Sequence, residues 1–424
     1  MLTDAINNAY IKILKEELVP AQGCTEPVAL AYCAAVARKT LGSIPKKCVV
    51  QVSGNIIKNV KSVIVPNTGG LTGISASVSA GIVAGDESAV LEVLKRIPPE
   101  KAPLIAQYMK EADITVRLAC GCPNFYIDIT VFGENDTARA VISNYHTNIV
   151  LVERNGEVLS KAGVVSDEST GLTDRHVLNV ADIIEFADTT DLSQLEFVLK
   201  RQIAFNSAIS REGLSGNWGA NVGKTLLNSY GSDIRIRAKA AAAAGSDARM
   251  SGCELPVIIV SGSGNQGMAA SLPVIEYARE LGSGEEKLLR ALIVSNLITI
   301  HQKTGIGRLS AFCGAVSAGC GAASGIAYLC GGRYEEISHT IVNALAIVSG
   351  MVCDGAKPSC AAKIAAAVDA GIFGYELFKN GNQFWGGDGI VTKGVDNTIA
   401  NVGRMAREGM RETDVEILKI MVGD

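Results

Sequence analysis

The sequence predicts an α+β protein: a mostly helical C-terminal domain, joined by the N-terminal helices, with an α+β domain of mainly antiparallel strands inserted. Short runs of β-branched residues crowd residues 48–153. Apolar residues at helical spacing dominate after residue 173 and before residue 44. We therefore expect a discontinuous helical domain over residues 1–44 and 174–424, and an α+β domain over residues 45–173.

The first half of the chain is expected to begin with two helices and continue into strands. Apolar spacing predicts a helix over Asp4–Leu18, and a second over Pro27–Leu41 because proline suits the first helical turn. The expected strands are Val49–Val52, Ser62–Val65, Ile114–Leu118, Tyr126–Val131, Ala138–Ser143 and Asn148–Glu153. Helices are expected among them at Gly73–Ala84, Glu87–Arg96 and Glu100–Glu111.

The second half is predicted to be almost wholly helical, with one strand-like run at Pro256–Val260. The expected helices are Val177–Ala187, Leu192–Arg211, Val222–Ser229, Arg235–Ala248, Leu272–Leu281, Glu285–Lys303, Ala311–Leu329, Tyr334–Val352, Cys360–Phe378 and Asp388–Gly409. Aromatic residues are only 5% of the chain while glycine reaches 45 residues, which indicates a core of small aliphatic side chains with close backbone approaches.

Composition narrows the class of partner. The net charge is −4 and no basic block is present, which argues against a nucleic-acid partner and favours a small molecule. The N-terminus has neither a basic nor an apolar leader region, so we expect a cytoplasmic protein. The uncharged stretch Leu309–Gly332 is long enough to span a bilayer, but its glycine, alanine, serine and cysteine content favours a buried helix and no membrane partner.

The eleven cysteines are expected to be thiols in that compartment, as core residues, metal ligands or catalysts. Cys313 and Cys320 are seven residues apart in a helix-compatible segment, about 10.5 Å along a helix axis, so at most one should bind a compact cluster. Cys353 and Cys360 have the same spacing, but Gly355 and Pro358 break any helix between them, and a loop can turn both sulfurs toward one point. Spacing alone leaves open that all of these are small core residues.

Several segments resemble the L-cysteine desulfidase family, which is related to the α chain of iron–sulfur L-serine dehydratases. They are Gly23-Cys-Thr-Glu-Pro27, Pro66-Asn-Thr-Gly-Gly70, Asp247-Ala-Arg-Met-Ser-Gly-Cys253, Ser261-Gly-Ser-Gly-Asn-Gln-Gly267, Phe312-Cys-Gly-Ala315 and Met351-Val-Cys-Asp-Gly-Ala-Lys-Pro-Ser-Cys360. The resemblance implies a [4Fe-4S] cluster bound by Cys313, Cys353 and Cys360. Three protein thiolates leave one of four irons open, and an open iron is a Lewis acid.

A base for the substrate Cα proton is also needed, and Cys24 is the candidate. It stands just before a helix, where a thiol pKa falls, although Glu26 opposes that effect. The resemblance implies the same role for Cys24. A buried loop cysteine without function remains the alternative.

Two glycine-rich loops are candidates for substrate binding. The loop containing Ser263, Gly264, Asn265 and Gln266 fits G-x-G-x-x-G, but no second strand with an acidic end follows, so no nucleotide is expected. Its polar groups suit a carboxylate or an amine. Asn67, Thr68 and Gly69 form a second polar loop at a strand end that could cap the same pocket. For each loop, a purely structural turn is the alternative that stays open.

The first hypothesis is therefore a lyase that converts L-cysteine and water to sulfide, ammonia and pyruvate with a [4Fe-4S] cluster and no pyridoxal phosphate. L-serine dehydration is the second. The chain has no cysteine after Cys360, whereas the serine dehydratases known to us carry a tail cysteine that reaches the cluster, which favours the first. A non-catalytic thiol- or metal-binding protein is the third hypothesis. A homo-oligomer is expected.

Overall fold

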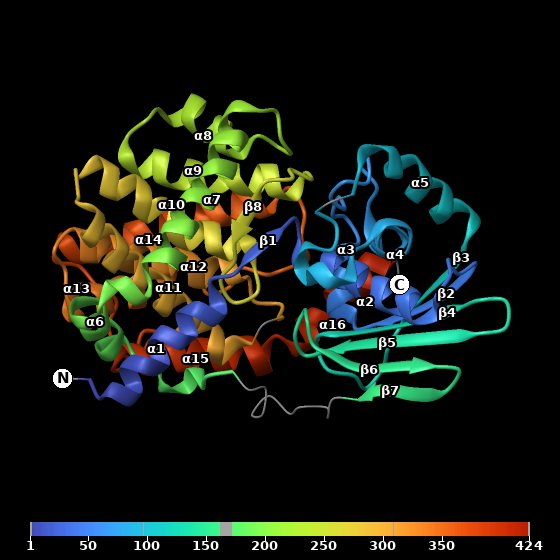
Figure 1. Cartoon of the computed structure of the whole chain (residues 1–424). Helices are drawn as coiled ribbons and strands as arrows, with labels where there is room; N and C mark the ends of the chain where they lie inside the picture. The colour runs from blue at the N-terminus through green and yellow to red at the C-terminus, as the bar shows by residue number, and fades with distance from the viewer. Residues whose placement is uncertain (1, 96, 162–171, 308, 423–424) are drawn as a thin grey trace.

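Helices and one large sheet occupy opposite ends of the molecule in the computed structural model, which describes residues 2–95, 97–161, 172–307 and 309–422 (Figure 1). The sheet has the strand order β3-β2-β4-β5-β6-β7. Its strands are β2 (Lys47–Val52), β3 (Asp113–Leu118), β4 (Tyr126–Phe132), β5 (Thr137–Ser143), β6 (Ile149–Arg154) and β7 (Glu157–Lys161). β2 and β3 are parallel and the other neighbours antiparallel, so the predicted α+β class is confirmed.

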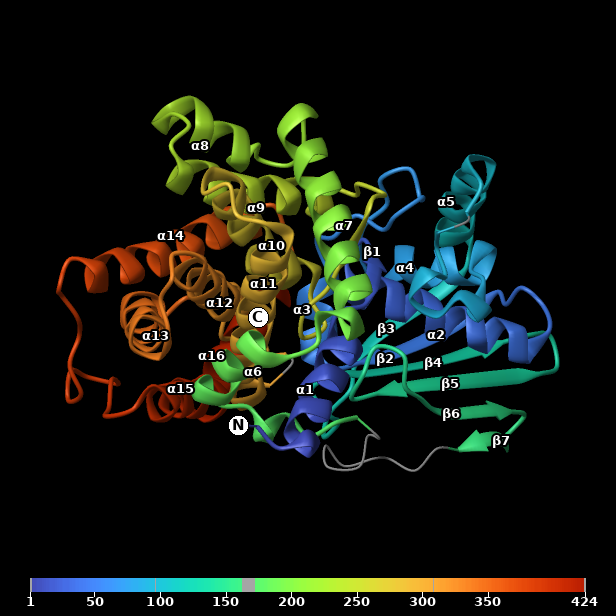
Figure 2. The ribbon, with the colours of Figure 1, turned by 60° about the vertical axis from the view of Figure 1, so that its left-hand side comes forward.

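One face of this sheet is covered by helices (Figure 2). They are α2 (Thr25–Leu41), α3 (Gly54–Val60) and α4 (Gly73–Ala84), with α5 (Ala102–Glu111) near the edge strand β3. Alternate residues of β4, such as Ile127 and Ile129, enter a core shared with Leu30 of α2 and Ile56 of α3. The sheet is therefore half-buried, as an antiparallel sheet with one covered face should be.

The helical end is built from the rest of the described chain. Its elements are α1 (Asp4–Glu17), α6 (Val180–Thr189), α7 (Glu196–Ser215), α8 (Val222–Tyr230), α9 (Ile234–Met250), α10 (Gly264–Glu280), α11 (Glu285–Ile306), α12 (Gly314–Leu329), α13 (Tyr334–Val348), α14 (Cys360–Lys379), α15 (Val395–Arg404) and α16 (Arg411–Val422). Two short strands, β1 (Pro20–Gln22) and β8 (Pro256–Ile258), pair antiparallel between them. In the described parts of the chain, no helix has the length and apolar character needed to cross a membrane.

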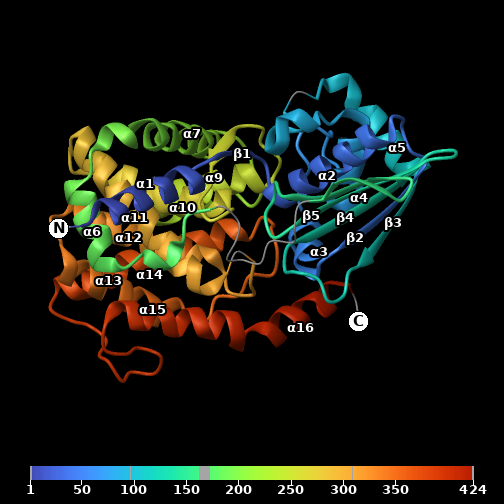
Figure 3. The same cartoon turned by 60° about the horizontal axis from the view of Figure 1, so that its bottom comes forward.

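The two N-terminal helices pack into different hydrophobic cores. Tyr10 and Leu14 of α1 enter the large core of the helical end, whereas Leu30 and Cys33 of α2 enter the core of the sheet. The expectation that α2 also packs onto the C-terminal helices is thus wrong, because its apolar face matches the covered face of β4 and β5. The C-terminal helix α16 crosses back to the sheet end (Figure 3), where Lys58 of α3 forms an ion pair with its Asp414.

Some local predictions differ from the structure. Ser62–Val65 makes only an isolated bridge, Ile64 to Thr72, rather than a strand. Glu87–Arg96 is a 3-10 helix over Glu87–Glu92, and its last residue lies outside the described part of the chain. The helix expected over Asp388–Gly409 begins only at α15, because Gly389 and Gly394 take positive φ angles that end regular structure before it. The segments α3, α16, β1 and β7 were not predicted.

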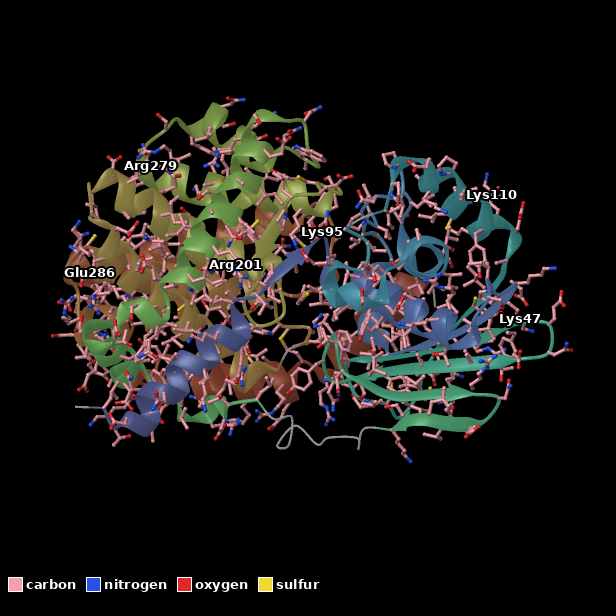
Figure 4. The ribbon with its side chains drawn as sticks, in the orientation of Figure 1. Lys47, Lys95, Lys110, Arg201, Arg279 and Glu286 are labelled. Atoms are coloured by element: carbon pink, nitrogen blue, oxygen red, sulfur yellow. The ribbon has the colours of Figure 1, made fainter. Side chains whose placement is uncertain are left out.

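The charged side chains labelled in Figure 4 are spread over both ends of the molecule. Lys47 and Lys110 lie at the sheet end, and Arg279 and Glu286 at the helical end. The interior between α12 and α14 is built differently, from glycine and alanine. A Cβ on Gly319 of α12 would lie 2.5 Å from the carbonyl oxygen of Ala367 in α14, so the two backbones are in direct contact.

We predict that Gly319→Ala lowers the free energy of unfolding by about 1–3 kcal/mol, because the added methyl must push α12 away from α14. Chemical denaturation measures the change. Gly305→Ala is the matched helical control, since its Cβ would meet nothing closer than 3.5 Å. Equal stability of the two variants would contradict the claim that direct backbone contact fixes these helices.

A second prediction concerns pH. Asp247 of α9 is fully buried; its Oδ2 accepts a hydrogen bond of 3.0 Å from the Gly223 N–H, and its Oδ1 has no partner among the described residues. Burial raises the pKa of this carboxyl to about 6. Because an unfolded aspartate titrates near pH ~4, the folded state should lose stability as pH rises from about 4 through 6.

The free energy of unfolding of Asp247→Asn, relative to that of the native chain, should therefore rise by roughly 2 kcal/mol between about pH 4 and pH 7. Denaturation of both proteins at several pH values between about 4 and 7 measures the difference. A difference that stays constant across the interval would mean that Asp247 is not the group responsible.

Candidate active site

A cavity of about 110 Å³ lies where the two ends of the molecule meet. It is lined by segments far apart in the sequence: the start of α2, α3, His146, the end of α9, the turn that opens α10, the end of α11, and the segments around the starts of α12 and α14. Its polar lining residues include Cys24, Thr25, Glu26, Asn59, His146, Arg249, Ser261, Ser263, Asn265, Gln266, Lys303, Ser310, Cys313, Cys353 and Cys360. The cavity thus unites groups that the sequence analysis had considered in separate segments.

Backbone hydrogen bonds place two of the three predicted ligand cysteines side by side. Phe312 and Val352 form an antiparallel bridge, Cys313 N–H donates to Met351 O at 3.0 Å, and Cys353 N–H donates to Ala311 O at 2.6 Å. Their side chains are close enough for a thiol–thiol hydrogen bond. The turn that leads to the third cysteine depends on Gly355.

Gly355 has φ +95°, and a Cβ there would lie 2.2 Å from the carbonyl oxygen of Lys58 in α3. No other residue type would let the loop turn this tightly against α3. Cys360, the first residue of α14, then points its Sγ back to Gly355 O, at 3.6 Å. All three sulfurs therefore belong to residues that line the same cavity.

The three thiols differ in the direction of their pKa shifts. The hydrogen bond from Cys313 lowers the pKa of Cys353 to about 6, with help from the ammonium groups of Lys58 and Lys303. The same bond raises the pKa of Cys313, which keeps the shared proton. Burial raises the pKa of Cys360. Cys353 is accordingly the most acidic of the three thiols, in a neighbourhood that holds cations.

Cys24 is the N-cap residue of α2, and its Sγ donates a hydrogen bond of 3.1 Å to Glu26 Oε2. The expected fall in its pKa is wrong: burial and the adjacent Glu26 carboxylate raise the pKa well above its usual value, although Arg249 and the backbone N–H of Glu26 act in the opposite direction. The helix terminus is too weak a dipole to offset complete desolvation. Thr25 and Asn59 donate two further hydrogen bonds to Glu26, at 3.1 and 3.3 Å.

The loop of residues 261–267 reaches the cavity. Ser263 caps α10 by accepting a hydrogen bond of 3.4 Å from the Gln266 N–H, and Ser263, Asn265 and Gln266 line the cavity. Gly264 lies behind them, where a Cβ would come within 2.5 Å of Arg249 Nε. Thr25 Oγ1 donates to Gly262 O at 3.0 Å, which ties this loop to the segment that carries Cys24.

The other predicted loop is placed differently. Asn67 Nδ2 donates to Leu94 O at 2.8 Å, and Thr68 Oγ1 donates to Val65 O at 2.7 Å. Gly69 takes φ +73° in the same turn. None of these three residues lines the cavity. Their neighbour Pro66 packs against Gly23, so the loop supports the segment that positions Cys24.

Several residues of the site were missed from the sequence. Lys58 and Lys303 are only 2% and 5% exposed, and the positive charge of each lowers the pKa of Cys353. Asn59 and His146 also line the cavity. One signal in the sequence could have identified Lys303. It follows the mostly apolar residues of α11, and a lysine buried in such a helix implies an anionic neighbour.

The thiol arrangement suits a cluster better than a single ion. Among the described residues, no three His, Cys, Asp or Glu side chains surround one ion position. In a [4Fe-4S] cluster each thiolate binds a different iron, so three thiols spread along one wall are the appropriate donor set. The nearby lysines would offset the added negative charge.

Comparison with known proteins finds relatives along nearly the whole chain. The family model described as serine dehydratase alpha chain matches residues 87–419. A UPF0597 protein of Desulfitobacterium hafniense is 61% identical over 419 residues, which cover 99% of this chain and 97% of the relative.

UPF0597 proteins of Treponema denticola and Lachnoclostridium phytofermentans are 48% and 50% identical. Those matches cover 98% of this chain and 98% of the first relative, and 97% of this chain and 99% of the second. The names of these relatives specify no reaction. The chain belongs to the serine dehydratase alpha chain family.

Proposed function

We propose that this protein is an iron–sulfur lyase that removes the β-substituent of a small amino acid without pyridoxal phosphate, with L-cysteine as the substrate. Sulfide, ammonia and pyruvate are the products. The observation that carries the proposal is that three thiols and the Cys24–Glu26 pair line one cavity of about 110 Å³.

Cys313, Cys353 and Cys360 would hold the [4Fe-4S] cluster, and the lowered pKa of Cys353 favours the thiolate form that binds iron. When bound, the cluster supplies a Lewis-acidic iron with no protein thiolate, which favours departure of the β-substituent. The buried side chain of Phe312 and the first residues of α12 line the cavity beside these thiols.

Cys24 and Glu26 form the proton-accepting pair. The Cα proton passes to Cys24 Sγ as the thiol proton passes to Glu26 Oε2, along the existing 3.1 Å hydrogen bond. The electron pair of the Cα–H bond forms the Cα=Cβ bond, and the Cβ–S bond breaks with its electrons leaving as hydrosulfide. The released 2-aminoacrylate tautomerises to the imine, and water hydrolyses the imine to pyruvate and ammonia.

L-serine is the second candidate substrate, and the description of the family model favours it. The same proton transfer applies, with hydroxide as the leaving group. The third hypothesis, a thiol- or metal-binding protein without catalysis, gives no reason for a buried thiol–carboxylate pair in the same cavity. Measuring the turnover of L-cysteine and of L-serine distinguishes these three hypotheses.

We predict that Cys313→Ala, Cys353→Ala and Cys360→Ala each abolish the brown absorbance of anaerobically purified protein, because each removes the sole protein ligand of one iron. Iron and sulfide analysis measures the loss. Cys320→Ala is the matched control: Cys320 is buried in α12, does not line the cavity, and donates to Ile341 O at 3.8 Å. Full iron content in any of the first three variants would remove that cysteine from the ligand set.

We further predict that the brown protein forms pyruvate and sulfide from L-cysteine faster than it forms pyruvate from L-serine. Cys24→Ala should lower kcat by at least about 100-fold while iron content stays unchanged. Cys33→Ala is the control, since Cys33 is buried in α2, the helix that Cys24 precedes, and its Sγ donates to Ala140 O away from the cavity. Faster turnover of L-serine would reassign the substrate, and a Cys24→Ala variant with native kcat would exclude the proposed base.

A further inference from the structure

Arg249, at the end of α9, is a buried cation in the wall of the cavity. It is 3% exposed, and its one hydrogen bond to another side chain runs from Nη1 to Asn265 Oδ1 at 3.1 Å. Nε has no partner among the described residues, and none of them places a carboxylate in an ion pair with this guanidinium. A buried guanidinium without an anion is costly, so its position requires an anionic ligand.

The cations around the cavity are divided between its two sides. Lys58, Lys303 and Lys363 act on the thiols Cys313 and Cys353. Arg249 acts instead on Cys24. An anion bound to Arg249 therefore lies next to the proposed base and not among the lysines around the thiols.

Neighbouring groups hold Arg249 in this position. Gly264 has no side chain, and a Cβ there would lie 2.5 Å from Arg249 Nε and 2.8 Å from its Cζ. Asn265 then accepts the Nη1 hydrogen bond from the next position of α10. The start of α10 is thus shaped around the guanidinium, which is the arrangement expected of an orienting residue.

Gln266 supplies a second buried polar atom in the cavity without a hydrogen-bond partner among the described residues. It is 7% exposed and lines the same cavity, and its Oε1 has no partner among the described residues. An amide oxygen accepts hydrogen bonds, so it suits an ammonium group. A donor and an acceptor of this kind in one small cavity match the two charged groups of an α-amino acid.

We infer that Arg249 binds the α-carboxylate of the substrate and that Gln266 Oε1 accepts a hydrogen bond from its α-ammonium group. The two contacts fix Cα beside Cys24 and leave the β-substituent to face the thiols. They select 2-amino acids over amines that lack a carboxylate. This inference rests on the proposed function for the identity of the reaction, but the binding contacts can be tested without turnover.

The test uses three unreactive probes and calorimetry on the full-length, anaerobically purified protein. L-alanine carries both charged groups, isobutyrate lacks the ammonium, and isopropylamine lacks the carboxylate. Arg249→Gln should weaken binding of L-alanine and isobutyrate at least tenfold and leave isopropylamine unchanged. Arg249→Lys should lose less, because it keeps the charge but not the bidentate geometry.

Gln266→Leu should show the opposite pattern, weakening L-alanine and isopropylamine but not isobutyrate. Gly264→Ala should imitate Arg249→Gln, because the methyl displaces the guanidinium. Arg279→Gln is the control: it removes an arginine from the exposed end of α10 and should change nothing. Circular dichroism of each variant verifies that it is folded.

Native affinity of Arg249→Gln for L-alanine would overturn the inference, as would failure of the native protein to bind L-alanine or isobutyrate. If neither L-cysteine nor L-serine is turned over while Arg249→Gln still loses the carboxylate probes, the proposed reaction fails and the binding site stands. If turnover occurs and KM is unchanged in Arg249→Gln, the reaction stands and the carboxylate anchor fails.

Discussion

The direct backbone contact between α12 and α14 is the constraint on which the site depends. Gly319 lies against Ala367, and Gly371 lies against the carbonyl of Gly319, so neither helix can move away without losing packing. Cys313 immediately precedes α12, and Cys360 begins α14. The bridge between Phe312 and Val352 then adds Cys353. Three thiols separated in sequence are thereby held on one side of a single cavity.

The sheet end completes the cavity rather than forming a separate binding unit. Lys58 of α3 reaches the neighbourhood of Cys353, and its ion pair with Asp414 ties α16 to the same place. The segment before α2 contributes Cys24 and Glu26. Charge is distributed accordingly: lysines surround the thiols, and Arg249 stands beside Cys24. A substrate with one anionic and one departing end has a single favourable orientation in such a field.

The sequence was sufficient for the fold class and for most long helices, because apolar periodicity is local. It was insufficient where a segment's structure depends on a distant partner. The apolar periodicity of α2 is the same whether the helix packs against other helices or against a sheet. Its actual partner is known only from the core that it shares with β4 and β5. The thiol of Cys24 was expected to be acidic from its place before a helix, yet its burial outweighs that effect. The role of Arg249 depends on Gly264 and Asn265, whose contact with it no spacing rule reveals.

The central claim is that three cysteines leave one iron of a four-iron cluster without a protein ligand. Mössbauer spectroscopy of ⁵⁷Fe-labelled protein, before and after addition of substrate, tests it most directly. We expect one iron subsite in about four to differ from the others and to shift alone when L-cysteine is added. Four equivalent iron sites that do not respond to the amino acid would contradict the account.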